Sequence, residues 1–281
     1  MESIFDLIER RYSVRNYTGR VIENDKIRKI KDYLDNNKKG PLNNDVRFEM
    51  IDATDYEQAE LKKFGTYGMI KGSRIFIAGA VKKGDKAMED FGYCMEKNIL
   101  MVTGLGLGTC WMAGALNRST FAQKINAKAD EVIAAVTPIG YAGDRKTLRE
   151  NLIRMAIGAK NRKKPEELFF DKSIDTPLDT DSCGQYSKVL DAVRMAPSAS
   201  NKQPWRIMKD NGNTYHLFMK ENPSYNNAFA GIKIQNIDMG IAMCHFELAA
   251  NELGLKGNWE IRNPLAAIGD LQYIVSWVGS I

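Results

Sequence analysis

Two stretches of the chain carry one pattern. Asp90-Phe-Gly92 is followed by Leu105-Gly-Leu107-x-x-x-Trp111, and Asp238-Met-Gly240 is followed by Leu253-Gly-Leu255-x-x-x-Trp259. The offset is constant, because 238 − 90 and 259 − 111 both equal 148. Repeats of this length indicate a duplicated domain and not a solenoid, whose period is roughly 20 to 50 residues. The chain therefore resembles a fused dimer.

A second match supports the repeat. Glu131 to Gly140 and Asp270 to Gly279 each have an acidic start, an alternating apolar run and a closing glycine, at an offset of 139. Upstream, Phe91 to Val102 and Met239 to Leu253 have apolar residues at helical spacing, and both stop at Gly-rich sequence, as C-capping predicts. The order helix, glycine turn, strand thus occurs twice.

The remaining elements complete the expected architecture. Further helices are predicted at Ile4 to Arg11, Asn24 to Leu34 with Asn24 as N-cap, Glu150 to Ile157 and Ser187 to Met195. Strands are predicted at Arg47 to Asp52, Arg74 to Ala78, Val132 to Ile139, Trp205 to Lys209, Thr214 to Met219 and Tyr273 to Val278. We expect an α+β fold of two tandem pseudo-symmetric copies, each with an antiparallel-rich sheet packed by long helices. The predicted parts are residues 1–145, a basic linker and arm at 146–172, and residues 173–281.

Composition narrows the class of protein. The 281 residues are 44% hydrophobic and 27% charged with a net charge of +5, the balance of a globular protein with a mild preference for anions. The four cysteines have no metal-like or disulfide-like spacing, and the N-terminus has no apolar signal region, so we expect a cytoplasmic protein. Ile99 to Leu116 is uncharged, but four glycines interrupt it and its second copy carries Glu252 and Lys256. A membrane span is therefore not expected.

Two kinds of chemistry are disfavoured. Gly104-Leu-Gly-Leu-Gly108 follows a helix, and Thr109 stands where the pattern G-x-G-x-x-G needs its third glycine, so the segment does not fit a dinucleotide fingerprint. His216 and His245 are the only histidines, and neither stands near a metal or triad signature. The chemistry must then come from an organic cofactor, with no metal.

Near the N-terminus, Arg11-x-Ser13-x-Arg15 places two guanidiniums and a hydroxyl at alternating positions. In an extended segment all three point to one side. Guanidiniums bind phosphate through bidentate charge-assisted bonds, so the pattern suits a phosphate dianion. The charged end of a surface helix is the alternative.

A loop in the second half is more specific. Pro197-Ser-Ala-Ser-Asn201-Lys-Gln-Pro-Trp205 brackets small polar residues with prolines, between a predicted helix and a predicted strand. Such a loop can present amide and hydroxyl donors to the edge of a flat heteroaromatic ring. An ordinary turn is the alternative. Between the halves, the segment from Gly143 to Asp175 is the most basic part of the chain, and it is interpreted as a solvated linker or as an anion clamp.

Together these motifs, with Pro138-Ile-Gly-Tyr141 after a strand, resemble the flavin motifs of the nitroreductase family over nearly the whole chain. The resemblance implies an α+β homodimer with FMN at the interface, reduced by NADH or NADPH. Carried onto this sequence, it assigns phosphate and ribityl contacts to Arg11 and Ser13, the phosphate or pyrimidine edge to Arg15, and the ring near N5 to Pro138, Ile139 and Gly140. It assigns the closing arm to Lys160 and Arg162, and ring contacts from the opposite half to Pro197, Ser198, Ala199, Ser200 and Asn201.

Each half retains only the motifs that the other lacks. The first half has Asn36 to Asn43 in place of the Pro-Ser-Ala-Ser-Asn loop, and the second has Trp277 in place of Pro138 and no Arg-x-Ser-x-Arg. We therefore expect one composite site with a single FMN, in a pseudo-dimer that can act as a monomer. Phe64, Tyr67 and Tyr225 are candidates for the open face of the flavin.

The resemblance implies a ping-pong reaction in which NADH or NADPH reduces the flavin and a small nitroaromatic, quinone or related acceptor reoxidises it. Arg15 is the candidate for a cation that tunes the flavin. The alternative is a flavin-binding storage or regulatory protein with little turnover. A third hypothesis, nucleic-acid binding through residues 145–164, is disfavoured because that segment has no interleaved aromatic residues.

Overall fold

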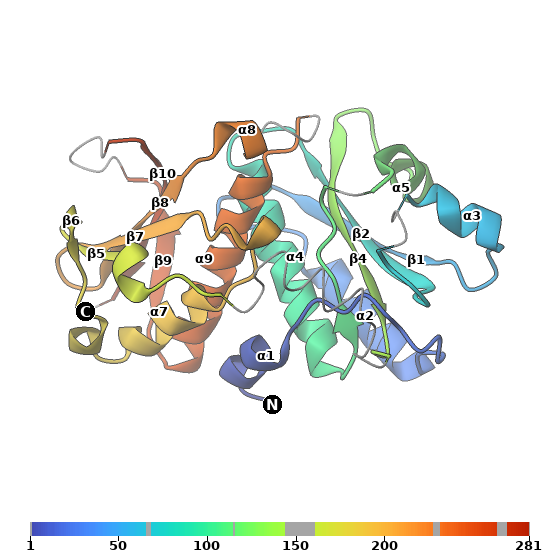
Figure 1. Cartoon of the computed structure of the whole chain (residues 1–281), viewed down its shortest axis with the longest axis horizontal. Helices are drawn as coiled ribbons and strands as arrows, with labels where there is room; N and C mark the ends of the chain where they lie inside the picture. The colour runs from blue at the N-terminus through green and yellow to red at the C-terminus, as the bar shows by residue number, and fades with distance from the viewer. Residues whose placement is uncertain are drawn as a thin grey trace.

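Two long helices lie side by side at the centre of the molecule, with one sheet on each side of the pair (Figure 1). They are α4 (Ala87–Gly104) and α9 (Ile234–Glu252), and both are buried along most of their length. A helix that is buried on all sides has no solvent-exposed face that needs polar residues, so the sequences of both helices are largely apolar. The computed structural model describes residues 2–65, 69–114, 116–143, 161–226, 231–262 and 269–280.

Two glycines allow the central helices to approach closely. A Cβ at Gly92 of α4 would lie 2.1 Å from the carbonyl oxygen of Ile237, and a Cβ at Gly240 of α9 would lie 1.9 Å from that of Glu89. These positions are 148 residues apart, so the two copies of the sequence pattern make the same backbone contact on each other. Any larger residue at either position would push the helices apart.

The first sheet has the order β1-β2-β4-β3, with every pair antiparallel. Its strands are β1 (Val46–Asp52), β2 (Ile75–Lys82), β4 (Glu131–Gly140) and the short β3 (Gly108–Thr109). The core around α4 and α2 (Asn24–Asn36) includes Ile75 and Ile77. A second cluster near α3 (Gln58–Lys63) and α5 (Arg118–Lys124) includes Phe76 and Ala78. Both faces of β2 are thus covered, which explains its continuous apolar sequence.

The second sheet has the order β6-β5-β7-β8-β10-β9 and is antiparallel except between β5 and β7. Its strands are β5 (Phe169–Asp171), β6 (Ser173–Pro177), β7 (Trp205–Lys209), β8 (Thr214–Lys220), β9 (Gly257–Glu260) and β10 (Leu271–Gly279). The helix α7 (Tyr186–Arg194) packs on α9. The remaining short helices are α1 (Ile4–Arg10), α8 (Pro223–Asn226), η1 (Pro165–Glu167), η2 (Thr180–Cys183) and η3 (Ala199–Asn201).

The predicted α+β fold with one sheet in each half is confirmed, and the predicted strands correspond to β1, β2, β4, β7, β8 and β10. The predicted helix at Glu150 to Ile157 lies outside the described residues. Phe169–Asp171, from the segment predicted as linker, forms β5 of the second sheet. The sequence boundaries of the two parts and the duplication itself stay predictions.

Ile99 to Leu116, the uncharged stretch, does not form one continuous helix. It contains the end of α4, a turn at Gly106 and β3. Within the described part of the chain, no helix is long and apolar enough to cross a membrane.

Candidate active site

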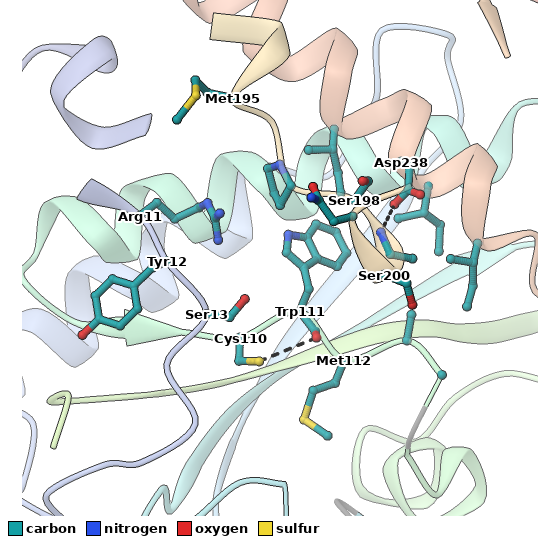
Figure 2. Close-up of a pocket in the computed structure, with 18 of the residues that line it drawn as sticks. Arg11, Tyr12, Ser13, Cys110, Trp111, Met112, Met195, Ser198, Ser200 and Asp238 are labelled. Atoms are coloured by element: carbon teal, nitrogen blue, oxygen red, sulfur yellow. Dashed lines mark hydrogen bonds between the residues drawn. The ribbon is translucent and has the colours of Figure 1, made fainter. Parts of the chain in front are cut away.

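A cavity of about 1020 Å³ opens between the chain that follows α1, the chain that follows β3, and the first turns of α9 (Figure 2). This volume is at the upper end of the range for small-molecule sites. The first half of the sequence contributes Glu9, Arg11, Tyr12, Ser13, Arg15, Met69, Ile70 and residues 110–114. The second contributes Arg162, Arg194, Met195, residues 197–201, Tyr225, Ile234, Ile237, Asp238 and Ile241.

The N-terminal motif is extended, as predicted. Ser13 forms a parallel bridge with Thr109 of β3, and the N–H of Val14 donates to the Thr109 carbonyl at 2.8 Å. Alternating side chains of an extended segment share a side. Arg11, Ser13 and Arg15 accordingly all line the cavity.

Four guanidiniums line this cavity: Arg11, Arg15, Arg162 and Arg194. Burial, with added repulsion from Arg11 and then Arg194, lowers the pKa of Arg162 to about 10. The Nε atoms of Arg11 and Arg15 are buried and have no hydrogen-bond partner among the described residues. Guanidiniums held together against their mutual repulsion, with donors to spare, form a site for an anion.

The basic arm is tied to the loop of the second half. Arg162 donates to Asn201 Oδ1 at 2.8 Å and to the Met195 carbonyl at 2.9 Å. The N–H of Lys163 donates to Gln203 Oε1 at 2.9 Å. These bonds hold the Arg162 guanidinium at the cavity wall, where the sequence predicted an anion clamp. Lys160, the other predicted arm residue, lies outside the described residues.

The loop between α7 and β7 has a strained backbone conformation. Ser200, Asn201 and Gln203 have φ values of 48°, 53° and 49°. The left-handed region costs roughly 1 to 2 kcal/mol for each residue with a side chain. Hydrogen bonds offset that cost, among them one from the N–H of Gln203 to Ser198 Oγ at 2.9 Å. The loop therefore has a specific conformation that side-chain hydrogen bonds stabilise, unlike an ordinary turn.

Two further contacts anchor this loop to the second half. The N–H of Ala199 donates to Asp238 Oδ1 at 2.9 Å, and the hydroxyls of Ser200 and Tyr225 lie 2.9 Å apart. All five predicted residues from Pro197 to Asn201 line the cavity. Of the three aromatic candidates for the open face, Tyr225 lines the cavity, Phe64 is buried in the cluster near α3 and α5, and Tyr67 lies outside the described residues.

Another wall comes from residues 110–114, which the sequence did not single out as a site. Pairing of β3 with β4 places Gly108 opposite Gly140 and Thr109 opposite Ile139. Pro138, Ile139 and Gly140 are buried in β4 and are not among the lining residues. The contact of these three residues with a flavin ring stays a prediction. The chain that follows β3 lines the cavity beside them.

Trp111 stands between the two sides of the cavity in the view of Figure 2. Its Nε1 donates to Glu96 Oε2 at 2.7 Å, and Glu96 Oε1 lies 3.1 Å from His245 Nε2 and 3.8 Å from Arg11 Nε. His245 Nδ1 faces the carbonyl of Ala192 at 2.9 Å and must donate to it. A proton must then lie between Glu96 and His245, and this buried network fixes two walls of the cavity.

The first turns of α9 supply an apolar wall. Ile234, Ile237 and Ile241 recur at intervals of three and four, so they share one side of the helix. Asp238 interrupts this wall and is 2% exposed. Burial raises the pKa of Asp238, opposed only in part by the N–H of Ala199. Its Oδ2 has no hydrogen-bond partner among the described residues.

Among the described residues, no group of three or more His, Cys, Asp or Glu side chains could hold a metal ion. His216 lies on β8 and contacts Ser276 and Asp210. Trp111 and Asp238 are the main site residues that the sequence did not identify. Both belong to the repeated pattern, which was interpreted only as evidence for duplication.

Comparisons with known proteins agree with this architecture. Residues 3–250 match the family model described as "Putative TM nitroreductase". The crystal structure of a nitroreductase from Thermotoga maritima is 19% identical, covers 98% of this chain and 93% of its own, and superposes with a TM-score of 0.62. A search of curated proteins found no match.

Smaller proteins match about half of the chain. A nitroreductase family protein from Clostridium novyi NT is 21% identical, over 51% of this chain and 87% of its own, with a TM-score of 0.43. A nitroreductase from Desulfovibrio desulfuricans, solved in complex with FMN, is 19% identical, over 54% of this chain and 96% of its own, with a TM-score of 0.39.

Within the described residues, a two-sheet α+β fold surrounds a cavity that is cationic in one part and apolar in another. The chain belongs to the nitroreductase family that this model describes, and the family likeness covers most of its length. The fold implied by the resemblance in the sequence is thereby confirmed.

Proposed function

We propose that the chain is an FMN-dependent oxidoreductase that takes reducing equivalents from NADH or NADPH and passes them to nitroaromatic, quinone or related acceptors in a ping-pong reaction. One FMN lies in the cavity described above. The observation that carries this proposal is the combination, in one cavity, of buried guanidinium nitrogens that have no hydrogen-bond partner among the described residues and an apolar wall formed by isoleucines of α9.

The residues present fit this cofactor. FMN has a phosphate dianion, a hydroxylated chain and a flat ring system, and the cavity offers arginines, hydroxyls and an apolar wall. The Nε atoms of Arg11 and Arg15 have no hydrogen-bond partner among the described residues, and Arg11 Nε has only the Glu96 carboxylate at 3.8 Å, so a ligand phosphate can supply the missing acceptors. The volume of about 1020 Å³ also suits a ligand of this size together with a small second substrate.

We assign the parts of the ligand by charge. Arg11, Arg162 and Ser13 hold the phosphate and the hydroxylated chain, with Lys160 as a further predicted contact. Residues 197–201 contact the ring from the second half, and Trp111 and residues 112–114 lie across the cavity from them. The fit of donors to ligand atoms is the reason for each assignment.

When bound, the flavin supplies hydride transfer, which no side chain of the cavity provides. The protein holds the ring against the apolar wall, excludes water with the isoleucines of α9, and presents fixed cations. Arg15 is the proposed tuning cation, because a preorganised positive charge beside the ring stabilises negative charge that develops there.

We also propose that the molecule is an internal pseudo-dimer, active as a monomer in the cytoplasm without nucleic-acid or membrane partners. The reciprocal contacts of Gly92 and Gly240 support the duplication, because equivalent residues of a true dimer meet in this way across a two-fold axis. The cavity supports the single site, because both halves of the sequence line it.

Stopped-flow mixing of the FMN-loaded protein with NADH, and separately with NADPH, tests the proposal. We expect rapid loss of the visible flavin absorbance, and its recovery when a quinone such as menadione is added afterwards. Retained flavin that neither nucleotide reduces at a useful rate would contradict the enzymatic role and favour storage or regulation.

A further inference from the structure

Asp238 is buried at the wall of the cavity with half of its carboxyl group unused. Oδ1 accepts the N–H of Ala199 at 2.9 Å, and Oδ2 has no partner among the described residues. A buried polar atom without a partner costs about 1 to 3 kcal/mol, and an ionised one costs more. Such atoms are rare in native proteins, and one at the wall of a cavity is placed where a ligand can use it.

The equivalent aspartate of the first half shows what a purely structural carboxylate looks like here. Asp90 lies 148 residues earlier, on α4, and is also buried. Its Oδ1 accepts the N–H of Leu42 at 2.8 Å, and its Oδ2 accepts the N–H and Nδ2 of Asn44 at 2.8 and 2.9 Å. Both carboxylate oxygens of Asp90 therefore accept hydrogen bonds from the adjacent loop, whereas only Oδ1 of Asp238 does so among the described residues.

The protonation state of Asp238 follows from its surroundings. Burial raises its pKa, and the only opposing contribution is the N–H of Ala199. Tyr225 faces it from α8 with a pKa that is itself raised by burial, and Glu89 of α4 is bonded to the neighbouring Asn236. The other charged groups are Glu9 and the four arginines of the cavity, and no ion pair joins any of these to Asp238 among the described residues.

We propose, resting on the proposed function, that Asp238 is a binding residue for the flavin ring, with a protonated Oδ2 that donates a hydrogen bond to an uncharged acceptor atom, a carbonyl oxygen or ring nitrogen. The contact fixes the ring against the isoleucine wall of α9. No assignment made above from the sequence gives Asp238 a role at the ligand.

The ring is the part of the ligand that fits this position. A phosphate would meet a carboxyl group at Asp238, and the arginines offer it a better site. In the view of Figure 2, Arg11 and Asp238 stand on opposite sides of the Trp111 indole. The neighbours of Asp238 along α9 are Ile234, Ile237 and Ile241, whose side chains offer an apolar surface for a flat ring. A neutral donor among apolar neighbours discriminates strongly for a ligand that carries the matching acceptor.

The test compares FMN affinity in the wild type, Asp238→Asn and Asp238→Leu, followed by quenching of flavin fluorescence. Asn keeps an acceptor for Ala199 and a neutral donor in place of Oδ2, so we expect wild-type affinity near neutral pH. Leu removes the donor, and we expect about tenfold weaker binding and a shifted visible absorption band of the bound flavin. Asp90→Asn is the matched control, with unchanged FMN affinity in the folded protein.

The pH dependence tests the same claim without relying on the Leu variant. The ratio of the wild-type Kd to the Asp238→Asn Kd cancels the ionisation of the FMN phosphate, and it should rise as the pH passes the raised pKa of Asp238 and should not fall at any pH below the Arg162 pKa of about 10. An infrared difference spectrum, wild type minus Asp238→Asn, should show the C=O stretch of a carboxylic acid even without flavin.

A ratio that falls with pH, the absence of the carboxylic acid C=O stretch, or unchanged FMN affinity and spectrum in Asp238→Leu would overturn the role of Asp238 alone. Failure of the wild type to bind FMN at all would instead overturn the proposed function, and the ligand named here with it. The two failures are therefore distinguishable.

Discussion

Asp90 with the loop around Leu42 and Asn44, and Asp238 with the loop from Pro197 to Asn201, form two corners that share one sequence pattern but differ in structure. At Asp90 the loop lies directly on the helix, so that a Cβ at Gly40 would be 2.2 Å from the aspartate Cγ. At Asp238 the loop from Pro197 to Asn201 is left-handed at Ser200 and Asn201 and lines a cavity. The difference indicates that a closed corner satisfies every polar group within the protein, whereas an open corner leaves some for a ligand.

The largest expected effect concerns the feature that both corners share. Gly92→Ala and Gly240→Ala should each lower the free energy of unfolding by about 3 kcal/mol, because the added methyl would overlap a backbone carbonyl of the facing helix. Urea denaturation checks this. Gly254→Ala is the control and should cost only about 1 kcal/mol, because its positive φ is the sole penalty. Unequal losses at Gly92 and Gly240 would weaken the case for pseudo-symmetry.

The next effect separates the open corner from the closed one. Arg162→Ala should weaken FMN binding by roughly 100-fold, because it removes a buried cation and frees Asn201 and the Met195 carbonyl. Equilibrium dialysis or fluorescence titration measures it. Arg262→Ala, which removes an exposed pair with Glu260, should leave the affinity unchanged. An Arg162 variant with wild-type affinity would mean that the phosphate binds elsewhere.

The same substitution should have different consequences at the two aspartates. Asp90→Asn places an amide against the donors of Leu42 or Asn44 and should cost about 2 kcal/mol of stability. Asp238→Asn places its amide where no donor points and should change stability by less than about 0.5 kcal/mol at acidic pH. Thermal or urea unfolding of both variants under one buffer decides this. Equal destabilisation would show that the two carboxylates are equally engaged.

The effect that is smallest per pH unit is the pH dependence of the apo-protein's stability. The pKa of Asp238 is raised in the folded state, so the unfolded state loses its proton first as pH increases. The wild type should therefore lose stability relative to Asp238→Asn from about pH 4, the unfolded pKa, up to the raised folded value, by about 1.4 kcal/mol per pH unit at most. Urea midpoints across this range measure the difference, and a constant difference would contradict a protonated Asp238.

The fold could be predicted from local sequence patterns, because the periodicity of apolar residues within a helix or strand is visible in a short segment. The period of apolar residues gave the central helices, alternation gave six strands, and spacing placed Arg11, Ser13 and Arg15 on one side of an extended segment. The missed strands β3, β5, β6 and β9 are short, with two to five residues, and depend on their partners. Pairing partners are a tertiary property that no local window contains.

The site was predictable only where a motif lay on one segment. Pro138, Ile139 and Gly140 were expected at the cavity, but the chain after the neighbouring strand β3 lines it. Sequence cannot decide which of two paired strands continues into a cavity. Asp238 was hidden for a similar reason, because its unsatisfied oxygen is defined by the absence of partners brought from a distant loop. The equivalent Asp90 could not reveal this difference from sequence, because its partners Leu42 and Asn44 are also distant in sequence.

We expect one cavity, lined by both halves of the sequence, to hold one flavin. The most direct test saturates the purified protein with FMN, removes the excess, denatures it and counts the flavin released per chain. We predict about one FMN per polypeptide, lost in Arg162→Ala under the same washing and retained in Asp90→Asn. About two FMN per chain, or retention that depends on the Asp90 corner, would contradict the claim.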